Sequence, residues 1–223
     1  MTCDRHPQAV SHGGFCPACL LEAALATPVG AGELTGGFTI LVPLSESVST
    51  SVFLVRNGAP DGRLLRLKVW HSPAPFDYLE RFRELRQQLG DWRDPRIDLP
   101  VAAYVDVRGR PAVLTEFRQG IPIIEAVGTG ALTHQQAVAM LRPLIDVVRV
   151  AHARELAHGS MVADAVIAHP GTGVAHLLDF GLATVASPTI APCAYVPGDR
   201  DGLAAIVRAV CACRQPRAGH AQL

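Results

Sequence analysis

The segment Leu178-Asp179-Phe180-Gly181-Leu182-Ala183 decides the fold of this chain. Short runs with strand character lie just before it, at 162–168 and 174–178. Further upstream, residues 137–153 repeat apolar side chains at helical spacing, which predicts a long buried helix. A second helix is expected at 202–213. The second half of the chain is therefore predicted to be mostly helical.

The first half has a different pattern. Most of its apolar segments are rich in β-branched and aromatic residues, which favours strands, and glycine-containing turn signals separate them. One segment with helical spacing interrupts the strands, at 76–89. The expected strands lie at 38–42, 51–55, 64–70, 101–107 and 112–117. Strands with one helix, followed by a mostly helical half, predict an α+β architecture in two lobes.

Composition narrows the functional classes. The chain has 223 residues, of which 49% are hydrophobic and 18% charged, with a formal net charge of zero. This size supports one large core or a compact two-lobed domain, and the charge balance does not favour a uniformly basic nucleic-acid surface. No apolar run reaches the roughly 18–20 residues of a membrane span, and the N-terminus lacks the apolar core of a signal peptide. We expect a cytoplasmic protein.

The chain resembles bacterial serine/threonine protein kinases in two segments, Ala151–His158 and Leu178–Ala183, which occur in the same order and at a similar spacing as in that family. The resemblance extends over residues 38–210. It implies a two-lobed kinase-like fold in which Asp179 matches the magnesium ligand and His158 matches the histidine of the catalytic loop.

The resemblance also assigns the nucleotide site. Lys68, at the end of the third expected strand, matches the lysine that pairs with nucleotide phosphates. Glu84 on the following helix is its expected partner, with Glu80 one turn earlier as the alternative. The backbone of the segment Leu114-Thr115-Glu116-Phe117 matches the hinge that meets the adenine; its Thr115, Glu116 and Phe117 complete the nucleotide-binding set.

The catalytic loop departs from the kinase pattern. Ser160 stands where the aspartate base is expected, and Ala165 where the second magnesium-binding asparagine is expected. Val162 replaces the loop lysine. Serine cannot act as a carboxylate base near neutral pH, and alanine cannot bind magnesium. No catalytic group of this loop is intact, so the resemblance implies a catalytically impaired protein.

The phosphate-covering loop also departs from the pattern. Ser45, Ser47 and Thr50 occupy the positions where the family has glycines, which weakens the expected binding of ATP and magnesium. The C-terminal lobe is short, and either Asp199 or Asp201 matches a buried aspartate on its next helix. We expect this truncated lobe to expose apolar surface for a protein partner or for self-association.

The N-terminal segment predicts a structural zinc knuckle. Cys3, His6, Cys16 and Cys19 supply two pairs of ligands around a glycine turn, with His12 as an alternative to His6. Four ligands leave no open coordination position, so this site is not catalytic. The second cysteine pair, Cys211 and Cys213, has poor spacing for a metal, and we expect free thiols on or beside a helix.

The predicted domains follow from these patterns. They are a zinc knuckle with a short helix at 1–27, a linker at 28–37, a kinase-like N-lobe at 38–116, a truncated C-lobe at 117–213 and a tail at 214–223.

Three functions remain open. The first is a pseudokinase with a regulatory or scaffolding role and weak or absent ATP binding. The second is an active serine/threonine kinase with an atypical loop, in which Asp164 replaces the missing metal ligand. The third is a zinc-knuckle interaction module with a remnant kinase fold, whose scattered arginines at 81–96 meet an acidic partner, although a solvated helix face with ordinary ion pairs is the favoured explanation of these arginines. A serine hydrolase is excluded, because no Gly-x-Ser-x-Gly turn is present.

Overall fold

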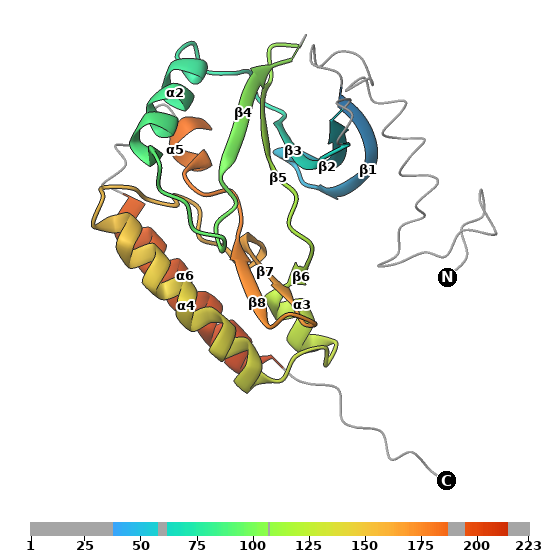
Figure 1. The fold of residues 1–223 in the computed structure, drawn as a ribbon, viewed down its shortest axis with the longest axis vertical. Coiled ribbons are helices and arrows are strands. Elements are labelled where there is room, and N and C mark those ends of the chain that lie inside the picture. The colour runs from blue at the N-terminus through green and yellow to red at the C-terminus, as the bar shows by residue number, and fades with distance from the viewer. Residues whose placement is uncertain (1–37, 58–61, 107, 187–194, 214–223) are drawn as a thin grey trace, which may run out of the picture. The chain divides into compact units, whose positions relative to one another are not determined.

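The computed structural model describes residues 38–57, 62–106, 108–186 and 195–213 (Figure 1). The chain divides into two compact units. The first unit comprises Met1–Leu79 and Val101–Phe117, and the second comprises Glu80–Pro100 and Arg118–Leu223. The sequence predicted one boundary between residues 116 and 117; the contacts instead group residues 80–100 with the second unit.

The first unit is built on a five-stranded sheet with the order β1-β2-β3-β5-β4. The pairs β1–β2, β2–β3 and β3–β5 are antiparallel. Alternating apolar side chains on one face of the sheet form a core that includes Phe53, Val55, Leu65, Leu67 and Leu114. The strands are β1 (Phe38–Glu46), β2 (Thr50–Asn57), β3 (Leu64–Trp70), β4 (Pro100–Val105) and β5 (Pro111–Glu116).

The second unit is mostly helical and contains a small antiparallel sheet with the order β6-β7-β8. Its strands are β6 (Ile121–Pro122), β7 (Val166–His169) and β8 (Val174–Leu177), and a 3-10 turn, η1 (Ala163–Ala165), precedes β7. Its helices are α3 (Ile123–Gly128), α4 (His134–His152), α5 (Leu182–Ala186) and α6 (Tyr195–Ala212); α2 (Tyr78–Leu89) begins at the end of the first unit and continues into this one.

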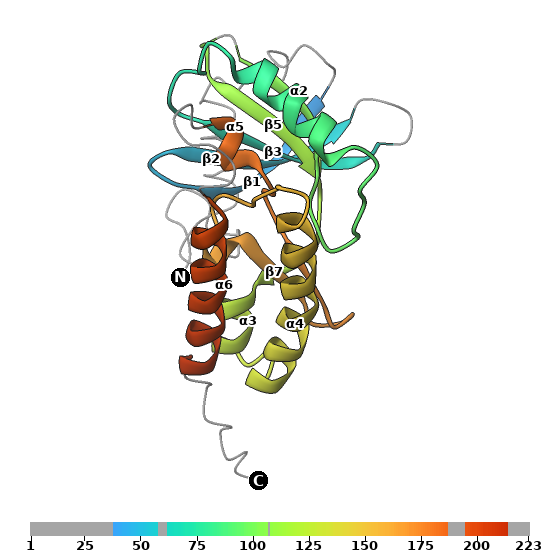
Figure 2. The same ribbon diagram turned by 90° about the vertical axis from the view of Figure 1, so that its left-hand side faces the viewer.

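Helices α4 and α6 lie side by side (Figures 1 and 2). They are antiparallel, because His134 at the start of α4 bonds to the carbonyl of Cys213, while His152 at the end of α4 bonds to Asp199 near the start of α6. Thr133 and Gln136 form a reciprocal capping box that fixes where α4 begins. A buried row from α4, which includes Leu141, Leu144 and Val148, supplies much of this unit's core.

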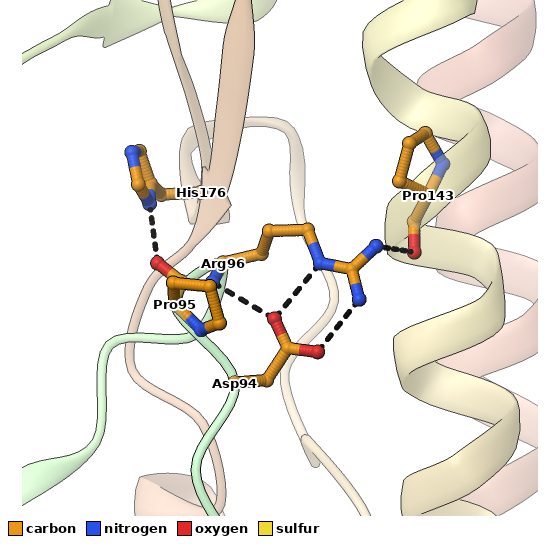
Figure 3. Close-up of polar contacts among 5 residues, drawn as sticks. All are labelled: Asp94, Pro95, Arg96, Pro143 and His176. Carbon is orange, nitrogen blue, oxygen red and sulfur yellow. Dashed lines mark hydrogen bonds and ion pairs between the residues drawn. The ribbon is translucent and has the colours of Figure 1, made fainter.

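The loop between α2 and β4 is tied to two other elements of the second unit (Figure 3). Both carboxylate oxygens of Asp94 accept hydrogen bonds from the Arg96 guanidinium, at 2.7 and 2.8 Å, and Arg96 also donates to the carbonyl of Pro143 in α4 at 3.2 Å. The side-chain hydrogen bond from Arg96 holds the pKa of Asp94 below its usual value. His176 of β8 bonds to the carbonyl of Pro95. Burial, reinforced by the charge of Arg118, lowers the pKa of His176.

Most of the predicted elements are present, with shifted ends. Helix α6 begins at Tyr195, seven residues before its predicted start at Gly202. Its first turn tolerates Pro197, because the amide hydrogen that proline lacks has no partner within the helix at that position. The short elements β6, α3 and α5 were not predicted. No helix in the described part of the chain is long and apolar enough to span a membrane.

Candidate functional site

Asp199 on α6 organises the loop that follows α4. Its side chain is 1% exposed and accepts three hydrogen bonds. The donors are the backbone amides of His158 and Gly159, at 2.7 and 2.9 Å, and the Nε2 atom of His152, at 3.1 Å. Of the two aspartates that the sequence offered for this role, Asp199 is the buried one, while Asp201 is exposed. A buried carboxylate needs such donors, because an unpaired buried charge is costly.

His158 links this loop to the segment around Asp179. Its Nε2 atom lies 2.7 Å from the carbonyl oxygen of Leu178, and its Nδ1 atom lies 3.2 Å from the amide of Ser160. A carbonyl can only accept, so Nε2 carries the hydrogen, and Nδ1 accepts from the Ser160 amide. These partners select a neutral imidazole with a defined tautomer. His158 is therefore a structural connector between two backbone segments.

Phe180 packs between aromatic neighbours and is fully buried. Its ring meets His158 and Trp92 edge to face, with centroid distances of 5.8 and 5.7 Å. The neighbouring backbone is left-handed at Asp179 (φ 61°) and Gly181 (φ 76°). The positive φ at Gly181 favours glycine, and a Cβ atom there would lie 2.8 Å from a methyl carbon of Leu85, which would have to shift.

The loop that follows α4 carries the residues that the sequence singled out, Ser160, Val162 and Ala165. Ser160 and Val162 are exposed, whereas Ala165 is 6% exposed and its carbonyl accepts the amide of Leu178 at 2.7 Å. Asp164 lies on the η1 turn and is exposed. The loop thus keeps its backbone hydrogen bonds, and the side chains that it exposes at these positions are the Ser160 hydroxyl, Val162 and the Asp164 carboxylate.

Lys68 lies on the face of the sheet opposite to the core cluster of the first unit. The register places Lys68 between Val52 of β2 and Val113 of β5, which are both buried. Its ammonium group lies 5.3 Å from the ring centroid of Trp70, a cation–π contact. Arg66 shares this face of β3, two residues earlier, and lies between Leu54 and Thr115. A second long cation therefore accompanies Lys68.

The tip of the β1–β2 hairpin has an internally bonded backbone. The hydroxyl of Ser47 accepts the amides of Ser49 and Thr50, at 3.3 and 3.0 Å, and the Ser47 amide donates to the carbonyl of Thr50 at 2.8 Å. His71 lies against this tip and bonds to Ser51 at 2.8 Å and to the carbonyl of Val48 at 3.0 Å. Three of the tip amides are thus used within the hairpin itself.

The remaining residues that were predicted to bind nucleotide lie in different surroundings. The Thr115 hydroxyl is buried and has no hydrogen-bond partner among the described residues. Glu116 forms an ion pair with Arg63, and Phe117 follows β5 and is half-buried. Glu84 is exposed on α2 in the second unit, while Lys68 belongs to the first, so their pairing stays a prediction.

The predicted zinc ligands Cys3, His6, Cys16 and Cys19 lie outside the described residues, as does the alternative His12. Among the residues that the structure does describe, no group of three or more His, Cys, Asp or Glu side chains could hold a metal. Cys211 and Cys213 are free thiols on and just after α6, as predicted.

Sequence reasoning missed His152 and His71. Their only signals were a histidine in the last turn of a predicted helix and one directly after a predicted strand, and neither position specifies a partner. Pairing with Asp199 and with the hairpin tip depends on contacts between elements that are distant in sequence.

No protein-family model matches the chain, and no curated protein matches it in sequence. The structure is similar to the crystal structure of Rad53 1–466 in complex with AMP-PNP, with a TM-score of 0.61 and 17% sequence identity. The match covers 78% of this chain and 47% of that chain, so this chain spans less than half of the Rad53 protein kinase structure. In total, 1633 solved chains match, and so widespread a fold does not by itself select a function. The chain has a protein-kinase-like fold, with a mixed α/β structure and an antiparallel sheet that resembles a kinase N-lobe.

Proposed function

We propose that the chain is a pseudokinase: a kinase-like protein that does not transfer phosphate and that acts by binding other molecules. The observation that carries this proposal is the loop held by Asp199. Its amide hydrogen bonds to Asp199 are complete, yet Ser160 and Ala165 occupy the positions of the base and the metal ligand. A loop that is kept in place without its reactive groups argues against phosphate transfer and leaves a binding or scaffolding role.

The hairpin tip supports weak or absent nucleotide binding. Amides of a glycine-rich tip stabilise phosphates only when they point outward and are unpaired. Here the amides of Ser47, Ser49 and Thr50 already have partners within the hairpin, each of which a phosphate would have to replace. Lys68 and the unpartnered Thr115 hydroxyl are the groups that favour some residual binding, with Asp179 as the proposed magnesium ligand.

A pair of assays on the full chain tests the proposal. The first is transfer of labelled phosphate from ATP to the chain itself and to a generic protein substrate. The second is the shift in melting temperature at millimolar ATP, with and without magnesium; saturation at 100 times Kd would stabilise the fold by roughly 2.7 kcal/mol. We expect no transfer, no rescue by Ser160→Asp, and a small shift or none.

Two variants keep the second assay specific. Lys68→Met removes the proposed phosphate contact, and Arg56→Met removes an exposed cation from the neighbouring strand β2 as a matched control. Phosphate transfer by the wild-type chain that Lys68→Met abolishes and Arg56→Met preserves would overturn the pseudokinase proposal and favour the active-kinase alternative.

The N-terminal zinc knuckle belongs to the same proposal as a structural element. Its ligands would be Cys3, His6, Cys16 and Cys19. Elemental analysis of the purified chain is expected to find one zinc ion per chain, which a strong chelator releases. A metal-free chain that binds no added zinc would remove the knuckle from the proposal.

A further inference from the structure

A groove with a volume of about 810 Å³ lies along α4 and α6 in the second unit. It extends from Ile145 to His152 on α4, with Ala153 directly after that helix, and from Val196 to Val207 on α6. At the helical rise of 1.5 Å per residue these spans are roughly 12 and 17 Å long. A ligand helix of about three turns would fill this length.

The groove is apolar at its base and open to solvent. Leu203 and Val148 are almost completely buried at its base, while Ile145 remains 37% exposed. The small side chains of Ala153 and Ala204 are exposed and leave room for side chains of a ligand. Open apolar surface between two helices suits a protein segment that buries its own apolar stripe there.

The charges that line the groove have one sign. Arg149 and Arg200 are basic, and none of the described residues that line the groove is acidic. The Arg149 side chain is 79% exposed, and the contact of its guanidinium with Asp146, at 3.9 Å, is long and solvated. It therefore remains available to an acidic group of a ligand.

His152 connects the groove to the loop of the candidate site. Its side chain lines the groove, and its Nε2 atom bonds to the same Asp199 oxygen that accepts the His158 amide. Arg200 follows Asp199 directly on α6. A ligand in the groove would thus lie beside the residue that holds the 158–165 loop.

We propose that this groove binds an amphipathic helix of a partner protein, with apolar residues at i, i+3, i+4 and i+7 and acidic residues beside them. The inference rests on the proposed function, because it names the class of partner for a non-catalytic binding protein. Charge complementarity selects this occupant. A second copy docked groove to groove would instead place Arg149 and Arg200 of each protomer close to one another, and like charges repel.

The probe is a fluorescently labelled, end-capped peptide of about 14 residues that carries leucines at this spacing and glutamates on the flanks. Its control keeps the leucines and replaces every glutamate with lysine. Fluorescence anisotropy measures binding of each peptide to the full chain. We expect the glutamate peptide to bind in the micromolar range and the lysine peptide to bind at least tenfold more weakly.

Three variants of the full chain locate the interaction. Arg149→Glu with Arg200→Glu reverses the charge of the groove and should weaken the glutamate peptide about tenfold while it strengthens the lysine peptide. Ala204→Glu places a bulky charge on the groove surface without removing a buried group, and it should also weaken binding of the glutamate peptide. Arg83→Glu with Arg108→Glu changes the same number of exposed charges outside the groove and should leave binding unchanged.

Equal binding of the glutamate peptide to the wild-type chain and the Arg149→Glu/Arg200→Glu variant would overturn the inference, as would no binding at all. A concentration-dependent dimer that Ala204→Glu dissociates, measured by sedimentation, would assign the groove to a second copy and refute a partner helix. The peptide assays contain no nucleotide, so their failure would leave the pseudokinase proposal standing, and phosphate transfer would overturn that proposal without affecting the peptide result.

Discussion

Replacement of Asp199 by alanine is the perturbation that tests the structural argument most directly. The substitution removes a buried carboxylate and leaves the amides of His158 and Gly159, together with the His152 ring, without their acceptor. Hydrogen bonds to charged groups contribute about 1.5–3 kcal/mol each, but the losses are not additive within one network. Breaking a buried charged network typically costs 3–5 kcal/mol, and we expect a loss of about that size in the free energy of unfolding.

The measurement is unfolding of the full chain in urea and by heat, followed by circular dichroism. A loss of this size corresponds to a decrease in melting temperature of about 6–20 °C for a chain of this length. Asp201→Ala is the matched control, since Asp201 is an exposed aspartate on the same helix and should change stability by no more than about 0.5 kcal/mol. A cost below about 1 kcal/mol for Asp199→Ala, or equal costs for both variants, would refute the role assigned to Asp199.

Three further predictions concern substitutions at single positions. In α6, Gly202→Ala should destabilise the fold by about 1–3 kcal/mol, because a Cβ atom would collide with the backbone carbonyl of Met161. Gly198 faces open space, so Gly198→Ala should stabilise the fold by about 0.5–1 kcal/mol. Urea midpoints measure both changes. Burial raises the pKa of Asp106, but hydrogen bonds from Arg110 outweigh burial and lower that pKa overall. The stability that this pair contributes is therefore present above about pH 4 and is lost as the pH falls through the pKa of Asp106 in the folded state. Asp106→Asn should flatten the dependence of melting temperature on acid pH. Tyr78→Phe removes a 3.0 Å hydrogen bond to a β5 carbonyl and should cost about 1 kcal/mol in thermal unfolding, and no measurable change would contradict it.

The kinase-like fold was predictable from local signals. Strand β3 occupies the predicted residues 64–70, where alternating apolar side chains favour a half-buried strand. The order of strands and helices, together with the segment Leu178–Ala183, was enough to predict the architecture that the likeness to Rad53 shows. The absence of an aspartate at residue 160 was also readable directly from the sequence, since it concerns residue type alone.

Other features depended on tertiary structure. The sequence could not choose between Asp199 and Asp201, because two residues on one helix differ in burial only through the elements packed against them. It predicted a serine-rich loop that binds phosphate poorly, but not that Ser47 bonds the amides of its own hairpin. The groove between α4 and α6, with Arg149 and Arg200 on one face, exists only because two helices that are far apart in sequence pack side by side.

The sequence by itself thus determined the spacing of apolar residues, and this spacing in turn predicted the order of the helices and strands. Both follow from residues that are neighbours along the chain. Burial, hydrogen-bond partners and the sign of charge in a groove depend on residues that are distant in sequence. Folding brings Asp199 to the His158 amide, 41 positions away, and only the tertiary structure could decide that contact.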